Sequence, residues 1–296
     1  MSEKNCIAEQ TFSIRWTDMD TYGHVTNSAY FKYLTNLRHD ILLKPFLPHS
    51  KVQFLVVHTQ CDFKLPVQYP AALTAKHYLE KMGNSSFVLS CDFFNAQGQL
   101  CTSAQTTLAT VDNKNFKPTA IPAEIKTILG EGVIEKPPRH QLELSGARLL
   151  NTIKIPLRWV DMNAGEHVDN AIYFEFMIEA RCALFPNSDL RNDLCLFFLI
   201  ATDCTFHKPL IYPDAVIVKQ YLLHVGSSSL NFAYQFFAAS APDTLYAEGK
   251  GVMVCVDPKT HKPIPVAKQL MERLLNNPIG NGLDRPAGGS RTAPTS

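Results

Sequence analysis

The chain carries one sixteen-residue motif twice, and this duplication is the strongest constraint on its fold. The first copy, at residues 15–30, reads R-W-T-D-M-D-T-Y-G-H-V-T-N-S-A-Y. The second copy, at residues 158–173, reads R-W-V-D-M-N-A-G-E-H-V-D-N-A-I-Y. A step of 143 positions relates the two copies, and the same step relates Arg38 to Arg181. The chain is therefore a duplication of one folding unit, and its 296 residues suit about two domains.

Composition indicates a compact globular protein. Hydrophobic residues make up 46% of the chain and charged residues 19%, and the formal net charge is +1. Because no block of like charges occurs, we expect no nucleic-acid partner. No apolar run approaches the length of a membrane span. The eight cysteines lack C-x-x-C spacing and the N-terminus lacks an apolar signal core, so we expect reduced thiols, no metal site and a cytoplasmic location.

Hydrophobic periodicity predicts the elements of the first copy. Phe12, Ile14 and Trp16 alternate with polar residues and predict a strand over 10–16. After the motif loop, apolar residues at helical spacing predict a helix from about 27 to 43, with Asn27 as a good N-cap type. Further strands are predicted at Val52–Phe63, Ala71–Met82, Phe87–Asn95 and Leu100–Val111, and a short helix at Pro122–Leu129. One helix with several antiparallel strands predicts an α+β arrangement.

The second copy repeats this plan, with a strand predicted at 152–160 and a helix at 170–185. The second helix is more apolar than the first, so we expect it to be the more deeply buried of the two. We predict these segments along the chain: a first, catalytic domain at 8–118, a linker at 119–150, a second, degenerate domain at 151–276 and a disordered tail at 277–296.

The motif loop combines groups that suit thioester hydrolysis. A thiol of pKa ~8.5 leaves readily, so the site must mainly supply a base or nucleophile and positive potential at the carbonyl oxygen. Asp20 lies seven residues before Asn27, where the helix begins and offers unpaired N–H groups and its dipole. We therefore predict Asp20 as nucleophile or general base and the Asn27 amide as donor to the carbonyl. For His24 two roles are open, shaping the loop or contacting substrate or water.

The string D-x-D-x-x-G-H-V-x-N-x-x-Y at 18–30 resembles the hotdog-fold thioesterases of the 4-hydroxybenzoyl-CoA thioesterase type. The E-A-R at 179–181 is similar to the helix ending of that group, and the spacing also resembles acyl-ACP thioesterases, which are two fused hotdogs. The resemblance covers 10–118 and 152–263. It implies two tandem hotdog domains, each an antiparallel sheet wrapped around a long central helix, paired as an intramolecular pseudo-dimer with active sites between them.

The resemblance implies an acyl-CoA or acyl carrier protein as partner, with coenzyme A as part of the substrate and no other cofactor. We assign Gly23, Val25 and Tyr30 to substrate binding, although Tyr30 and Tyr173 suit core positions better than pocket positions. The acyl group, the choice between coenzyme A and carrier protein, and assembly into homo-oligomers are open. A non-catalytic acyl-thioester binding or scaffold protein is the alternative from another class.

The second copy departs from the first at the position that matters most for chemistry. Asn163 replaces Asp20 and cannot act as a carboxylate nucleophile. We therefore expect a degenerate second site, kept for binding or packing and formed by Asn163, Glu166, His167 and Asn170. Glu166, where the first copy has Gly23, is a candidate substitute, and Asn163→Asp is a change that could revive the site.

Two further pairs of charged residues recur in both copies. Asp18 and Asp161 suit a structural role, bonding loop amides or pairing with Arg15 and Arg158. Arg38 and Arg181 come late in their predicted helices. There they suit the helix dipole or a buried carboxylate partner better than a ligand.

Overall fold

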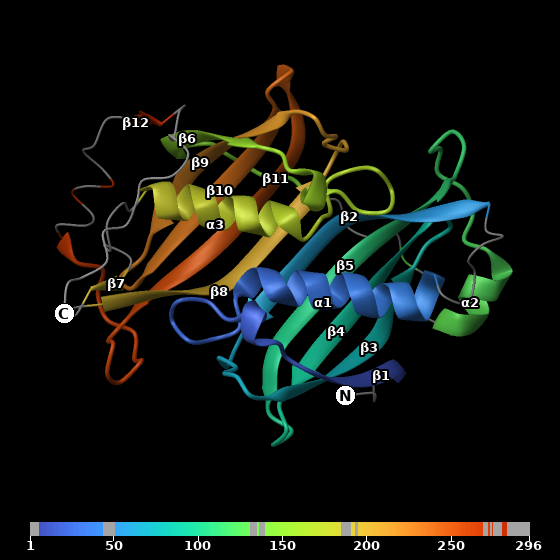
Figure 1. Cartoon of the computed structure of the whole chain (residues 1–296), viewed down its shortest axis with the longest axis horizontal. Helices are drawn as coiled ribbons and strands as arrows, with labels where there is room; N and C mark the ends of the chain where they lie inside the picture. The colour runs from blue at the N-terminus through green and yellow to red at the C-terminus, as the bar shows by residue number, and fades with distance from the viewer. Residues whose placement is uncertain are drawn as a thin grey trace.

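The computed structural model describes residues 6–43, 51–130, 135, 140–184, 191–192, 195–268, 272, 274 and 280–282. These residues form two similar units that lie side by side (Figure 1). In the first unit the elements are β1 (Cys6–Ser13), α1 (Asn27–Arg38), β2 (Val52–Phe63), β3 (Ala72–Met82), β4 (Ser86–Phe94), β5 (Leu100–Asp112) and α2 (Ala123–Leu129). In the second they are β6 (Arg148–Pro156), α3 (Ile172–Leu184), β7 (Arg191–Asn192), β8 (Cys195–Phe206), β9 (Ala215–Val225), β10 (Ser229–Ala238), β11 (Ala241–Val256) and β12 (Gly280–Gly282).

All strands in the described part of the chain belong to one 12-stranded sheet, and its order repeats the duplication. The first unit contributes β1-β3-β4-β5-β2 and the second contributes β8-β11-β10-β9-β6, all paired antiparallel. Strands β2 and β8 join the units through an antiparallel ladder that runs from His58↔Thr205 to Asp62↔Ala201. The predicted α+β arrangement is confirmed, and the sheet continues from one unit into the other.

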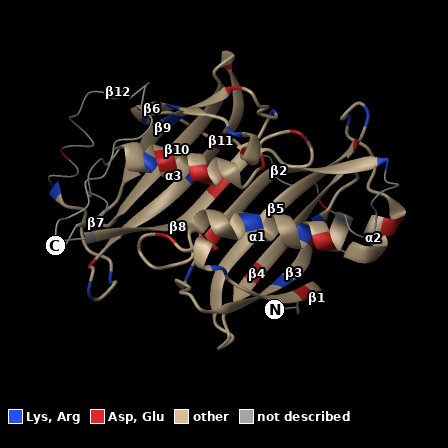
Figure 2. Ribbon diagram, viewed as in Figure 1, with Lys and Arg blue, Asp and Glu red and all other residues tan. Residues whose placement is uncertain are grey.

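Helices α1 and α3 lie on the same face of this sheet (Figure 1). The rings of Phe31 and Phe174 stack between the helices, with centroids 3.3 Å apart. Figure 2 shows charges of both signs along the two helices, and Lys32 of α1 forms an ion pair with Glu175 of α3. The two helices therefore pack against the sheet and against each other.

The prediction that the second helix is the more buried is wrong. Eight of the twelve residues of α1 are buried, compared with seven of the thirteen of α3. One reason is Ile178, an apolar residue of α3 that is only partly buried. It lines a cleft between the two units, which is described below. Each buried Phe or Leu of these helices contributes about 1.5–3 kcal/mol by leaving water.

Several element boundaries differ from the predictions. The first strand ends at Ser13, because the chain leaves the sheet for a 3-10 turn at Trp16–Asp18. Trp16 is therefore 72% exposed, with its ring edge against Tyr69, and Trp159 of the second copy is 73% exposed. The N-cap of α1 is Thr26, and Asn27 is the first helical residue.

The predicted linker and tail are only partly covered by the structure. Strand β6 begins at Arg148, before the predicted end of the linker, and the short helix α2 packs its Ile125 and Leu129 into a second core cluster. Of the predicted tail only β12 lies within the described residues, so the prediction of disorder remains untested. No helix in the described part of the chain has the length and apolar character needed to cross a bilayer.

Candidate functional site

The loop of the first copy is a closed turn built around Asp20. Its Oδ1 accepts hydrogen bonds from the backbone N–H groups of Tyr22 (2.8 Å) and His24 (3.3 Å). The Asp20 N–H donates to the carbonyl of His24, and Gly23 takes a positive φ of 79° that suits glycine. The carboxylate is half-buried and lies close along the chain to the start of α1.

The start of α1 has no side-chain cap. Thr26 occupies the N-cap position, but its side chain makes no cap hydrogen bond. The N–H groups of a first helical turn have no partner within the helix, so Asn27 presents a donor and the positive end of the dipole. Asp20 lies in the loop and Asn27 is the first residue of α1, and their catalytic roles stay predictions.

The second unit forms a wall beside this loop. The rings of Tyr22 and His24 both meet the ring of Phe198 on β8 edge-to-face. Burial lowers the pKa of His24 below its ordinary value, Asp20 opposes this effect, and His261 adds to it. His24 is therefore a neutral imidazole near pH 7, held between the two units.

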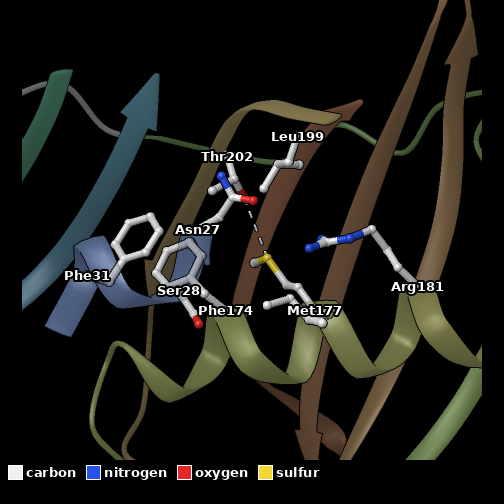
Figure 3. A pocket seen from close by; sticks show the side chains of 9 residues that line it. Asn27, Ser28, Phe31, Phe174, Met177, Arg181, Leu199 and Thr202 are labelled. Carbon is white, nitrogen blue, oxygen red and sulfur yellow. Dashed lines mark hydrogen bonds between the residues drawn. The ribbon is translucent and has the colours of Figure 1, made fainter. Parts of the chain in front are cut away.

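A narrow cleft lies beside Asn27, and its walls are packed too closely to admit a water molecule (Figure 3). Helix α1, helix α3 and strand β8 all supply its walls, which consist of Asn27, Ser28, Phe31, Phe174, Met177, Ile178, Arg181, Leu199 and Thr202. Thr202 Oγ1 donates to the carbonyl of Lys250 (2.7 Å) and lies 3.7 Å from the sulfur of Met177. Sequence reasoning missed the residues from the second unit, because no local spacing indicates which strand pairs with β2.

The residues assigned to substrate binding lie outside this cleft. Tyr30 is only 3% exposed, and its ring packs against Tyr33, Phe63 and Phe93 in the core. Val25 is buried, and its N–H donates to the carbonyl of Val67. The expectation that Tyr30 suits the core is confirmed by this packing.

Asp18 and Asp161 have the structural role expected of them. Asp18 is buried and accepts from the N–H and side chain of Arg15 and from the hydroxyl of Tyr33 at 2.7 Å. Burial alone would raise the pKa of Asp18, but the hydrogen bonds from Tyr33 and Arg15 outweigh it and hold the pKa below its usual value. Asp161 accepts from Arg158 in the same way.

The second copy keeps the turn but lacks the carboxylate. Asn163 Oδ1 accepts from the N–H of Gly165 at 2.8 Å, as Asp20 Oδ1 accepts from Tyr22. Its Nδ2 lies 3.3 Å from His167 Nε2. Glu166, the candidate substitute base, is exposed and takes a left-handed φ of 60°.

A carboxylate has instead appeared six residues later, at the start of α3. Asp169 stands where the first copy has Thr26, and its Oδ1 accepts from the N–H of Ala171 at 2.9 Å in the turn that leads into α3. Its Oδ2 lies 3.5 Å from Asn163 Nδ2. The sequence shows Thr26 in one copy and Asp169 in the other, but only the structure shows what the Asp169 carboxylate contacts.

Asp169 also faces a buried cation from the first unit. Burial lowers the pKa of Arg38 to about 10, and the charge of Asp169 opposes that shift. The Arg38 guanidinium donates to the hydroxyls of Thr106 and Thr35 (3.3 Å each), and Thr35 in turn reaches Asn170. The Asp169 carboxylate of the other unit therefore acts on Arg38 through its charge, and among the described residues no ion pair joins the two.

Comparison with known proteins agrees with the duplicated motif. A family model described as the thioesterase-like superfamily matches residues 14–129 and again residues 157–274. The long-chain acyl-CoA thioesterase FadM of Escherichia coli (strain K12) is 25% identical over 125 residues, which are 41% of this chain and 94% of that protein.

Two solved structures match most of the chain. A protein of Lactobacillus plantarum named as an oleoyl thioesterase has a TM-score of 0.72 at 13% identity, covering 90% of this chain and 99% of its own. An acyl-ACP thioesterase of Bacteroides thetaiotaomicron VPI-5482 has a TM-score of 0.65 at 14% identity, covering 83% of this chain and 97% of its own. With the family match, these likenesses identify the hotdog thioesterase fold in two repeats.

Proposed function

Because the chain belongs to the thioesterase-like superfamily, whose model matches both repeats, we propose that it hydrolyses an acyl-CoA or acyl carrier protein thioester to a free acid and a thiol. The observation that carries the proposal is the loop that fixes the Asp20 carboxylate seven residues before the uncapped start of α1, where Asn27 borders the cleft. The reaction needs no cofactor besides the coenzyme A or carrier of the substrate.

The proposed reaction begins at the thioester carbonyl, which accepts a hydrogen bond from the Asn27 amide. In one route Asp20 takes a proton from water, the water oxygen attacks the carbonyl carbon, and the Asn27 N–H stabilises the oxyanion. The C–S bond then breaks and the thiolate leaves with the proton. In the other route Asp20 Oδ2 attacks the carbonyl carbon, the C–S bond breaks and the thiolate leaves, which gives a mixed anhydride. Water then cleaves the anhydride to the free acid and the Asp20 carboxylate, and a proton from that water ends on the thiolate. In both routes the reacting atom is Oδ2 of the Asp20 carboxylate, because Oδ1 accepts the two hydrogen bonds of the turn.

We also propose that the two repeats act as an intramolecular pseudo-dimer, with the catalytic half at 8–118. Three contacts support this arrangement: the β2–β8 ladder, the Phe31–Phe174 stack and the cleft that both units line. Neutral His24 supports the loop from its place against Phe198. A second competent site is not part of the proposal, because Asn163 has no carboxylate and Asp169 is held in the turn before α3 by the N–H of Ala171.

The proposal is tested by incubating the protein with acyl-CoAs of increasing chain length and a thiol-trapping dye. We expect saturable release of free thiol that disappears in Asp20→Asn. Saturable binding of acyl-CoA without thiol release would contradict the proposal and favour a binding protein. Acyl carrier protein substrates, tested in parallel, decide which thiol carrier is used.

A further inference from the structure

One ring of the second unit, Phe198 on β8, meets three other rings at the loop of the first site. Resting on the proposed function, we propose that Phe198 and His261 are positioning residues of that site, which the second repeat contributes to hold His24 and Tyr22 beside Asp20. The repeat that has no carboxylate of its own therefore completes the site of the other repeat.

The first support is the arrangement of the rings around Phe198. Its centroid lies 6.3 Å from that of Tyr22, 5.9 Å from that of His24 and 5.6 Å from that of His261. The interplanar angles are 86°, 78° and 78°, so all three rings meet Phe198 edge-to-face, a geometry that aromatic rings prefer. Tyr22 and His24 belong to the loop, and His261 belongs to the turn that follows β11. One side chain therefore joins the loop of the first unit to two segments of the second.

The second support is a difference between His24 and its counterpart His167. The imidazole of His167 stays within its own loop, where Nδ1 lies 2.9 Å from the carbonyl oxygen of Gly165 and Nε2 lies 3.3 Å from Nδ2 of Asn163. Within the residues that the structure describes, no protein group hydrogen bonds to the ring nitrogens of His24, and its ring lies against Phe198. The orientation of His24 therefore depends on the other unit, whereas that of His167 depends on its own loop.

The third support is that the first unit lacks both residues at the equivalent positions. The step of 143 positions that relates the two loops also relates Leu55 of β2 to Phe198. Phe116 corresponds to His261, because each is the fifth residue of a D-x-K-x-x-K-P turn, at 112–118 and 257–263.

The two turns share one backbone conformation and differ in this side chain. The N–H of Phe116 donates to the carbonyl of Asp112 at 3.0 Å, and that of His261 donates to the carbonyl of Asp257 at 2.8 Å. Both residues take a left-handed φ, 58° and 54°. The phenylalanine ring and the imidazole therefore lie beside the loop that has kept its carboxylate, and both are absent from the equivalent positions.

Holding His24 in this way also protects the chemistry of Asp20. Burial lowers the pKa of His24, Asp20 opposes this shift, and His261 adds to it. A protonated His24 would stabilise the negative charge of Asp20 and make the carboxylate a weaker base and nucleophile. The ring of Phe198 shields one side of the imidazole from water, so it keeps His24 neutral as well as oriented.

The test compares changes in the second unit with matched changes in the first, all in the full chain. Phe198→Ala removes the ring, Phe198→Tyr keeps it, and His261→Phe introduces the residue that the first unit has at position 116. Leu55→Ala and Phe116→Ala are the matched changes at the equivalent positions. Thiol release from an acyl-CoA that the parent cleaves is measured between pH 5 and 8, and urea unfolding confirms that each variant is folded.

Phe198→Ala should lower kcat at pH 8 by about tenfold or more and change KM by less than about threefold, because a displaced loop loses its alignment with the thioester. The acid limb of its kcat/KM profile should move to higher pH, since an exposed His24 takes up a proton more readily. His261→Phe should move the same limb in the same direction and leave kcat at pH 8 unchanged. Phe198→Tyr and both changes in the first unit should leave kcat and the acid limb as in the parent.

Proton NMR of the histidine rings gives a readout besides activity. The His24 signal, assigned by its absence in His24→Gln, should titrate at higher pH in Phe198→Ala than in the parent, and as in the parent in Leu55→Ala.

A folded Phe198→Ala with the kcat and acid limb of the parent would overturn the inference and leave the proposed function standing, and so would equal losses in Leu55→Ala. If Phe198→Ala does not fold, His261→Phe decides, because this residue is exposed; an unmoved acid limb then overturns the inference. Failure of the parent to cleave any acyl thioester would overturn the proposed function itself.

Discussion

The change Asp20→Asn separates the proposed catalytic role of the Asp20 charge from the structural role of its side chain in the turn. The second copy already carries asparagine at the equivalent position, Asn163. Asn163 holds the second loop with its Oδ1, which accepts from Gly165 at the same 2.8 Å that joins Asp20 Oδ1 to Tyr22. Asparagine at position 20 keeps this oxygen and loses only the charge. We expect its free energy of unfolding to stay within about 0.5 kcal/mol of the parent.

The expected loss of activity is far larger. A positioned general base contributes about 10²- to 10⁴-fold to the rate, which corresponds to about 3–5 kcal/mol of transition-state stabilisation. Asp20→Ala should lose the same activity and, in addition, about 1–2 kcal/mol of stability, because the N–H groups of Tyr22 and His24 lose their acceptor.

Both quantities are measurable on the same samples. Thiol release with a cleavable acyl-CoA gives kcat/KM, and urea unfolding gives the free energy of unfolding. The reasoning fails if Asp20→Asn keeps more than a tenth of the parent kcat/KM, and Glu166 and Glu179 are then the next carboxylates to test. It also fails if Asp20→Asn destabilises the fold as much as Asp20→Ala does.

Three further predictions concern the second loop, the buried His58 and the ring stack between the helices. Asn163→Asp alone should not create hydrolysis in a chain inactivated at the first site, because the Asp169 carboxylate already lies 3.5 Å from the changed group, in the turn that leads into α3. Thiol release should require the added change Asp169→Thr, and release by the single variant would contradict this. Burial lowers the pKa of His58 to about 4, and the imidazole of His140, which stacks on it, adds to this shift. Because the pKa of this imidazole is higher in the unfolded chain, protonation at low pH favours unfolding. The free energy of unfolding should therefore fall by about 2 kcal/mol as the pH is lowered from 7.5 to 5. His58→Gln should remove that part of the pH dependence, and an unchanged slope in urea titrations would refute the assignment. Phe31→Ala, at a fully buried ring in the stack between the helices, should cost about 3–5 kcal/mol, whereas Phe116→Ala, at an exposed ring, should cost little; equal losses in urea unfolding would contradict the packing.

Local patterns in the sequence were sufficient for the elements and for part of the site. Strand β2 has the predicted bounds, Val52–Phe63, because alternating residues and turn signals act over a few positions. The pairing of Asp18 with Arg15 was predictable for the same reason, since the two lie three residues apart.

Features that depend on contacts between distant segments could not be predicted. The exposure of Trp16 depends on a 3-10 turn that takes the chain off the sheet. The placement of Met177 and Arg181 beside Asn27 depends on β2 pairing with β8, and nothing in either strand alone specifies that partner. The effect of the Asp169 charge on Arg38 also joins two distant segments. The sequence therefore indicated that the second site is altered, but it did not indicate the contacts of Asp169.

The β2–β8 ladder has a consequence for how the molecule behaves at low concentration. Two separate subunits that share a site dissociate on dilution and lose that site together. Here the partner is covalently attached and its backbone is paired from His58 to Asp62, so the specific activity should be independent of protein concentration. The same ladder makes neither half expendable, because a chain cut between them would leave an unpaired strand edge open to aggregation.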